Sequence, residues 1–236
     1  MATRPRNFNP DFYYHIYNRG TEGRNIFNSD EDYYHFLDSI DFYSYNQSIP
    51  YTIFRELNPK TKANYLNPKG WGTKRVKILA FCAMPNHFHL LLKPVATGGI
   101  PRFISDISNS HARYFNIKYE RTGRLFQETY KAKEISSEPS LMQVIRYIHL
   151  NPVFSSKTNP KKALIKPQDY PYSSYRNWIG QQSQLRLDQE ELERWISYSG
   201  GPDKYRSFVE SKIGGDVTHG IEDLILESPQ HLNPKG

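Results

Sequence analysis

Two histidines stand one residue apart in the stretch MPNHFHLLL, residues 84–92. In a β-strand alternate side chains share a face, so His87 and His89 point to one side while Phe88 points to the other. A buried imidazole loses its hydrogen bonds to water and needs new partners, so Val or Ile would fill such a face at lower cost. The pair therefore predicts a site that uses imidazole nitrogen.

A tyrosine and an asparagine stand four residues apart in the segment LMQVIRYIHLNP, residues 141–152. This segment has apolar residues at helical spacing, which predicts a helix that docks on a sheet through Leu141, Val144, Ile145 and Ile148. Tyr147 and Asn151 lie one above the other on a flank of that apolar face. If the helix packs over the histidine face, two imidazole nitrogens and one amide oxygen form a mixed site for Mg²⁺ or Mn²⁺.

Each of these residues also has a purely structural interpretation. A pair of alternate histidines occurs by chance in many strands, and most of the 18 tyrosines of this chain must be packing or surface residues. An asparagine before Pro152 commonly ends a helix. Tyr114 and Tyr130 are further phenols near the expected site, interpreted first as core or stacking residues. His149 lies on the other flank of the helix from Tyr147, which indicates a surface or capping role.

The elements that must position these groups follow from hydrophobic periodicity. Strands are predicted over residues 12–20, 76–84, 87–94 and 123–135, and helices over 29–46, 100–119 and 141–152, the last ended by its proline. Residues 47–75 are rich in Asn, Pro, Lys and Gly and predict a long loop. This loop is interpreted as a solvated insertion or, alternatively, as a segment whose charge suits a phosphate backbone. The order of elements predicts an α+β fold, a ferredoxin-like antiparallel sheet covered by helices.

Residues 1–180 are expected to form this domain, and residues 181–236 a small helical C-terminal extension with a tail. The tail is interpreted as a loosely held end or, alternatively, as a segment that docks across the active site and competes with DNA. Phe88, Leu90 and Leu92 make the sheet face opposite the histidines apolar, so either a partner subunit or the extension is expected to cover it. Monomer and homodimer both stay open.

The composition favours an acidic partner. The chain has 236 residues, with 31 Lys and Arg against 24 Asp and Glu, and a formal charge of +7. This balance is typical of nucleic-acid-binding proteins, although many soluble proteins are mildly basic without a specific reason. A single cysteine, Cys82, excludes an internal disulfide framework. No apolar stretch approaches the roughly 20 residues of a membrane span, and a signal-peptide pattern is lacking. We expect a cytoplasmic protein.

Three motifs, MPNHFHLLL, YIHLNPV and QDYPYSSYR, together resemble the REP-associated tyrosine transposases. These are an IS200-like branch of the single-tyrosine HUH transposases, in which U means a hydrophobic residue. The similarity spans about residues 12–180, including the opening YHIYNRGTEGRNIF. The resemblance implies the HUH endonuclease fold, with His87 and His89 as metal ligands and Tyr147 as nucleophile. Asn151 occupies the position of the third ligand, where many relatives carry Gln.

The resemblance also implies an activity, a cofactor and a substrate. The activity would be metal-dependent cleavage and strand transfer on single-stranded DNA beside an imperfect hairpin, through a 5′-phosphotyrosine intermediate. It would serve DNA transposition or the mobilisation of a repeat. Mg²⁺ or Mn²⁺ would assist, because a phenol with a pKa of about 10 is a poor nucleophile. Two alternatives stay open: a domesticated protein that binds hairpin DNA or RNA without cutting it, and a metal-dependent nuclease that uses water.

Basic residues near the predicted site are candidates for contacts with DNA phosphates. Those around the fourth strand are Arg121, Arg124, Lys131 and Lys133. Two more DNA-binding candidates, Arg19 and Arg24, flank the first loop and are interpreted as contacts to the hairpin or its guide bases. Such charges bind phosphates without reading bases. The alternative for any single residue in this set is a solvated surface charge.

Overall fold

A four-stranded antiparallel sheet forms the centre of the computed structural model, which describes residues 5, 7–66, 72–95, 97–157, 166–181, 185 and 187–225. The strand order is β2-β3-β1-β4. The strands are β1 (Tyr13–Arg19), β2 (Val76–Met84), β3 (His87–Pro94) and β4 (Lys131–Ile135). This order and the antiparallel pairing confirm the predicted α+β, ferredoxin-like class.

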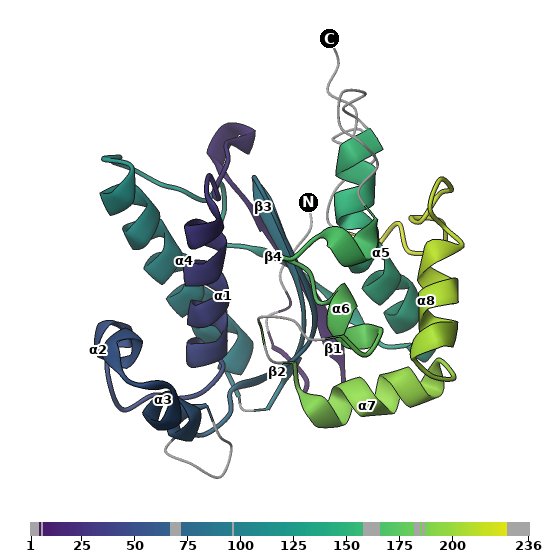
Figure 1. The fold of residues 1–236 in the computed structure, drawn as a ribbon, viewed down its shortest axis with the longest axis horizontal. Helices are drawn as coiled ribbons and strands as arrows, with labels where there is room; N and C mark the ends of the chain where they lie inside the picture. Colours follow the sequence, from purple (N-terminus) through teal and green to yellow (C-terminus); the bar gives the residue numbers. More distant parts are fainter. Residues whose placement is uncertain are drawn as a thin grey trace.

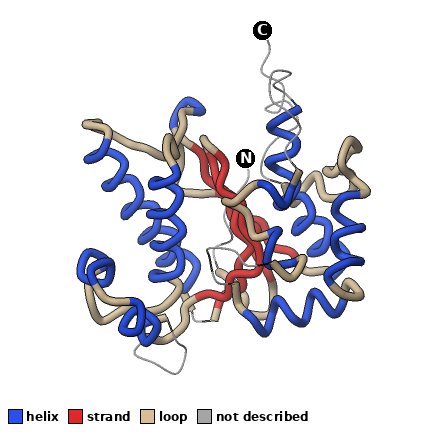
Figure 2. The backbone as a smooth tube through the Cα atoms, viewed as in Figure 1, coloured by secondary structure: helices blue, strands red, loops and turns tan. Residues whose placement is uncertain are grey.

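Helices cover both faces of the sheet (Figure 1). One side holds α1 (Asp30–Tyr43) and α4 (Gly99–Lys118); the other holds α5 (Glu138–Lys157), α6 (Tyr175–Trp178), α7 (Gln189–Tyr198) and α8 (Pro202–Glu210). Two 3₁₀ turns, η1 (Thr21–Gly23) and η2 (Pro167–Asp169), lie in connecting loops. Figure 2 shows the strands as a central layer between the two groups of helices. None of the described helices has the length and apolar character needed to cross a membrane.

A buried carboxylate starts α1 and ties it to α4. The Asp32 side chain accepts hydrogen bonds from the backbone N–H groups of Asn28 at 2.7 Å and Ser29 at 3.1 Å, and from the Lys118 ammonium at 2.7 Å. Burial would raise the pKa of Asp32, but the bonds from Lys118, Asn28 and Tyr119 outweigh it and lower the pKa to about 2. The Asp32 carboxylate therefore holds both the start of α1 and the end of α4.

Residues 47–75 contain two short helices, α2 (Tyr51–Glu56) and α3 (Pro59–Tyr65), where the sequence predicted a loop. The Asn58 side chain caps α3 by accepting a hydrogen bond from the backbone of the third residue after it, at 2.9 Å. Two aromatic side chains of α2 are buried against Phe42 in a small second core. The loop prediction was wrong because a few buried aromatic contacts hold a segment whose overall composition is polar.

Two predicted boundaries also differ from the structure. The fourth strand, β4, occupies five residues at the end of the predicted range 123–135. Pro152 lies inside α5 instead of ending it. Leu150 and Val153, on either side of this proline, are buried. Tertiary packing thus continues the helix past a residue that local preference would place at its end.

The apolar sheet face opposite the histidines is covered by helices of the domain itself. Phe88 of β3 packs on Phe36 of α1, with ring centroids 5.0 Å apart, and on Phe126 at 5.9 Å. Phe103, Ile104 and other residues of α4 belong to the same core. The expectation that a partner subunit or the C-terminal extension covers this face was therefore wrong.

The C-terminal helices pack on the face that carries the histidines. The indole of Trp195 in α7 donates a hydrogen bond to the Tyr13 hydroxyl at 2.8 Å, and that hydroxyl in turn donates to Glu191. The backbone N–H of Asp188 donates to the carbonyl of Ile78 in β2 at 2.9 Å. The helical character predicted for the extension is confirmed by α7 and α8, whose buried residues share one hydrophobic core with the sheet.

Candidate active site

The strand β3 presents His87 and His89 on the same face of the sheet, toward α5. β1 pairs with β3 so that Tyr17 lies opposite His89 and Arg19 lies opposite His87. His89 is fully buried, whereas His87 is half-buried. The two ring centroids are 5.0 Å apart. The two-residue turn between β2 and β3 thus places both imidazoles at the start of a central strand.

α5 brings Tyr147 and Asn151 to this face. The Tyr147 ring centroid is 5.5 Å from that of His89, in an edge-to-face arrangement. The Asn151 amide nitrogen donates to the backbone carbonyl of Tyr147 at 3.0 Å. Because a carbonyl only accepts hydrogen bonds, this contact identifies the nitrogen of the amide and leaves Oδ1 for another partner. Tyr147 is 2% exposed and Asn151 5% exposed, so both lie inside the packed interface.

His89 is held neutral at the centre of this group. Burial, and then the neighbouring His87 and His15, lower the pKa of His89 well below its usual value, while the Asn151 side chain acts in the opposite direction. An amide oxygen near the ring acts in this direction, because its partial negative charge favours the protonated, charged form of the imidazole. The buried Nε2 atom of His89 makes no hydrogen bond of normal geometry among the described residues. His89 therefore presents a neutral nitrogen of the kind that binds metal ions.

Two further residues of β1 complete the cluster. His15 Nε2 lies 2.9 Å from His89 Nδ1, and their rings are stacked with centroids 5.1 Å apart. The Tyr17 ring lies 5.0 Å from that of His89 and 5.6 Å from that of His87. The sequence reading did not single out either residue. The signal was present, because the alternation in FYYHIYNRG places His15 and Tyr17 on one face of β1.

The donor set fits a divalent ion held by two nitrogens and one oxygen. Among the described residues no group of three or more His, Cys, Asp or Glu side chains is arranged to hold a metal. A site here would instead use His87, His89 and the amide oxygen of Asn151, which are neutral donors. Imidazole nitrogen suits Mn²⁺ better than Mg²⁺, which prefers oxygen. The buried Nε2 of His89 is the observation that supports this fit.

Three of the predicted DNA-binding residues share the sheet face of the histidines. Lys131 of β4 lies opposite Tyr17 of β1, and Lys133 lies opposite His15. Arg19 pairs in register with His87. Side chains of directly paired residues point to the same side of a sheet. The structure therefore brings these three cations to the same face as the candidate site, and their contact with DNA stays a prediction.

The other three predicted DNA-binding residues lie in loops. The backbone N–H of Thr21 donates to the carbonyl of Leu125 at 3.0 Å, so the loops that carry Arg24 and Arg124 lie side by side. Arg24 is paired with Glu22 at 3.3 Å. The remaining residue, Arg121, stacks over the ring of Phe115 at the end of α4 and is half-buried.

Two alternatives to these assignments do not agree with the structure. Tyr114 lies on α4, on the opposite side of the sheet, where it contacts Asp32 and stacks on His35 with ring centroids 3.9 Å apart. His149 is fully buried, with Nδ1 2.5 Å from the Tyr205 hydroxyl and Nε2 2.7 Å from a serine hydroxyl. The surface or capping role expected for His149 was wrong, because the C-terminal helices cover this flank of α5. Tyr130 is buried.

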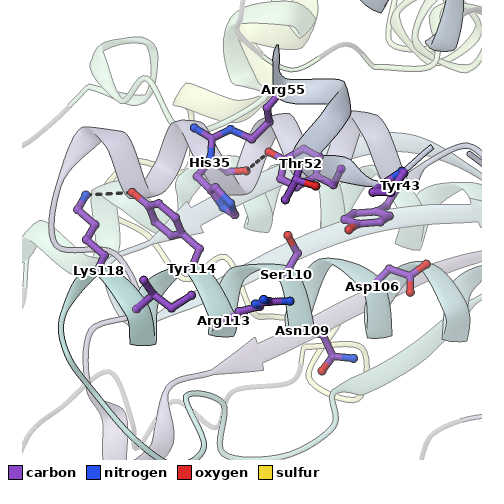
Figure 3. Close-up of a pocket in the computed structure, with 13 residues that line it drawn as sticks. His35, Tyr43, Thr52, Arg55, Asp106, Asn109, Ser110, Arg113, Tyr114 and Lys118 are labelled. Carbon is purple, nitrogen blue, oxygen red and sulfur yellow. Dashed lines mark hydrogen bonds between the residues drawn. The ribbon is translucent and has the colours of Figure 1, made fainter. Parts of the chain in front are cut away.

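A hollow of about 680 Å³ lies on the far side of the sheet from these residues. Side chains of α1, α2 and α4 line it, including Tyr43, Arg55, Arg113 and Lys118 (Figure 3). It contains neither of the strand histidines nor Tyr147. The imidazole and phenol cluster is therefore a separate, tightly packed site.

One of the comparisons with known proteins covers the residues of this site. Residues 53–151 match the family described as "Transposase IS200 like". No curated protein matches the chain. A solved structure described as the REP-associated tyrosine transposase bound to a REP hairpin is similar with a TM-score of 0.45 and 14% identity, over 76% of this chain and 86% of that one. The matched segment contains both histidines, Tyr147 and Asn151, so the part of the chain that is similar to this family includes the candidate site.

Proposed function

We propose that this protein is a metal-dependent single-strand DNA endonuclease and strand transferase that cleaves beside a DNA hairpin through a covalent phosphotyrosine. One observation carries the proposal: Tyr147 of α5 and the histidine pair of β3 meet on one buried face. The match of residues 53–151 to the family described as "Transposase IS200 like" supports a transposase activity. The basic side chains on the same face suit a polyanionic substrate.

The chemistry assigned to Tyr147 needs no external energy source. Its hydroxyl oxygen attacks the phosphorus of a DNA phosphodiester, a new bond forms between that oxygen and phosphorus, and the bond from phosphorus to the 3′ oxygen breaks. The phenol loses one proton and the departing 3′ oxygen takes one up, so the products are a 5′-phosphotyrosine and a 3′-hydroxyl. One phosphodiester replaces another, and a second strand end can reverse the step.

His87, His89 and the Asn151 oxygen would hold a divalent ion beside Tyr147. When bound, the ion supplies polarisation of a phosphodiester oxygen and compensates the charge that develops on the phosphoryl group. The chain's own contribution is orientation: β3 fixes the imidazoles, and α5 fixes the phenol relative to them.

Substrate entry must involve a local opening. Tyr147 is 2% exposed and His89 is fully buried, so a DNA strand cannot reach the phenol in the closed arrangement. A single strand fits the proposal better than a duplex, because its scissile phosphate can enter a narrow site between a helix and a sheet. The half-buried His87 marks the accessible end of the pair.

The experiment is a covalent-capture assay on the full-length protein. Hairpin DNA with a single-stranded flank is labelled at its 3′ end in one sample and at its 5′ end in another, then incubated with Mn²⁺ or Mg²⁺. A 5′-phosphotyrosine retains the 3′-labelled fragment in an SDS-stable adduct and releases the 5′-labelled one. Tyr147→Phe is expected to abolish the adduct. Tyr114→Phe, on the other side of the sheet, is the matched control and should retain it.

Each alternative gives its own result in the same gel. An adduct that persists in Tyr147→Phe would move the nucleophile to another residue and refute the assignment. Cleavage without any adduct would indicate a nuclease that uses water. Binding of the hairpin with neither cleavage nor adduct, across metals and single-stranded flanks, would indicate a regulator that does not cut.

A further inference from the structure

We propose that His15 and Asn86 are positioning residues that hold the two strand histidines in the same tautomer, each with its proton on Nδ1 and its lone pair on Nε2. The inference rests on the proposed function, because it gives both lone pairs the task of binding the divalent ion. It is argued from hydrogen-bond partners that lie outside the ligand set. Neither His15 nor Asn86 would touch the ion itself.

The first relay, a chain of two hydrogen bonds, starts from a backbone carbonyl in the C-terminal segment. His15 Nδ1 lies 2.9 Å from the carbonyl oxygen of Leu224. A carbonyl oxygen only accepts, so the proton of His15 must be on Nδ1. Ile221 and Ile225, which flank Leu224 in the chain, are buried, and the backbone N–H of Leu224 donates to the carbonyl of Ile221 at 2.8 Å. The contact joins residues 209 positions apart in the chain.

The same relay then determines the state of His89. His15 is completely buried, and a buried charge is costly, so the ring is neutral and its Nε2 carries a lone pair. The 2.9 Å contact between His15 Nε2 and His89 Nδ1 therefore has one direction, from His89 to His15. With its proton on Nδ1, His89 presents the lone pair of its buried Nε2 to the site.

A second relay acts on His87 from the turn between β2 and β3. The Asn86 amide nitrogen donates to the backbone carbonyl of Gly23 at 3.2 Å, which identifies the two ends of the amide. Asn86 Oδ1 lies 2.7 Å from His87 Nδ1. An amide oxygen only accepts, so His87 donates from Nδ1 and its lone pair is also on Nε2.

The two relays are built in the same way, and both leave the lone pair of a strand histidine on Nε2. Each starts from a backbone carbonyl, passes through a single side chain and ends on the Nδ1 of a strand histidine. Hydrogen bonds of this kind orient histidine ligands and select their tautomer in metal sites generally. A strand supplies the spacing of the imidazoles, but spacing does not decide which nitrogen faces the ion. His15 and Asn86 make that choice.

The first measurement uses the wild-type protein with ¹⁵N-labelled histidine and no metal. Long-range ¹H–¹⁵N correlation spectra at pH 7.5 distinguish the protonated nitrogen of each neutral ring. His89→Gln and His87→Gln, each of which removes one set of signals, provide the assignment. We expect the proton on Nδ1 in both rings. A proton on Nε2 of His89 or of His87 would overturn the inference, and this result needs no His15 variant to fold.

The second measurement titrates Mn²⁺ into two variants that replace His15 by an amide side chain of different length. His15→Gln can still place an acceptor near His89 Nδ1, whereas the shorter side chain of His15→Asn can bond Leu224 but does not reach His89. We expect His15→Asn to weaken Mn²⁺ binding about 10- to 100-fold and His15→Gln to stay within about threefold of wild type. At Asn86, substitution by Ala should weaken binding and substitution by Asp should not.

The outcomes separate this inference from the proposed function. Equal Mn²⁺ affinity in wild type and a folded His15→Asn would refute the role of His15 while covalent capture by Tyr147 stands. Absence of Mn²⁺ binding by the wild-type protein would refute the metal role on which both depend. Absence of the covalent adduct, with the expected tautomers and Mn²⁺ affinities, would refute the nuclease alone.

Discussion

Mild acid should destabilise this protein through histidines that are buried in their neutral form. Burial lowers the pKa of His35 and His149 to about 3 and that of His111 to about 4, and it lowers the pKa of His89 in the same direction. In the unfolded chain each ring would titrate near its ordinary value of 6.5. Below that pH the unfolded state binds protons that the folded state does not, so stability is lost as the pH falls.

The loss of folding free energy at a given pH follows from the difference between the folded and unfolded pKa values of each ring. At pH 5.5, one unit below the unfolded value, each such ring costs about 1.4 kcal/mol of folding free energy. His35, His111 and His149 together cost about 4 kcal/mol, and His89 adds to this loss. The figure does not depend on whether a folded pKa is about 3 or about 4, because both lie well below pH 5.5. Carboxylates such as Asp32, with a pKa of about 2, stay ionised across this window.

Urea unfolding followed by tryptophan fluorescence at pH 7.5 and pH 5.5 measures this difference. His111→Gln, which can still donate to the Ile26 carbonyl that His111 contacts at 2.7 Å, should reduce the pH effect by about 1.4 kcal/mol. His219→Gln is the control, because that side chain is 88% exposed, and it should leave the effect unchanged. Equal stability at the two pH values, within about 1 kcal/mol, would refute the reasoning.

Three other perturbations test the packing and the proposed DNA face. Asp32→Asn removes the charge that joins α1 to α4 and should cost about 2 kcal/mol in urea unfolding, whereas Glu31→Gln, 69% exposed, should cost less than about 0.5. His149→Leu leaves two buried hydroxyls without their shared partner and should lower stability by about 2–3 kcal/mol; an unchanged melting temperature would contradict this. Lys131→Ala should weaken single-stranded DNA binding on every sequence and reduce its salt slope by about 0.7, whereas Lys60→Ala, in exposed α3, should not.

Local patterns of the sequence were enough to predict the main elements and the residues that meet on one face. The alternation in β3 places His87 and His89 together, and the spacing of four in α5 stacks Tyr147 on Asn151. Both patterns depend on residues within a few positions of one another. The strand and helix order that they belong to also limits the topology to few choices, which is why the ferredoxin-like sheet could be predicted.

Other features required the folded chain, because they depend on partners far away in the sequence. The helices within residues 47–75 exist through burial of aromatic side chains, and α5 passes Pro152 because its neighbours are buried. His149 is a core residue because the C-terminal helices cover it.

His15 shows most clearly that some features of the site depend on partners far away in the sequence. By itself the sequence determined that two imidazoles, a phenol and an amide would be presented at the right spacings on a strand and a helix. Tertiary structure decided which nitrogen each imidazole presents, since that depends on a carbonyl 209 residues from His15 and on the amide of a turn residue. Hydrogen-bond direction is a property of the partner as much as of the residue, and only the fold chooses the partner.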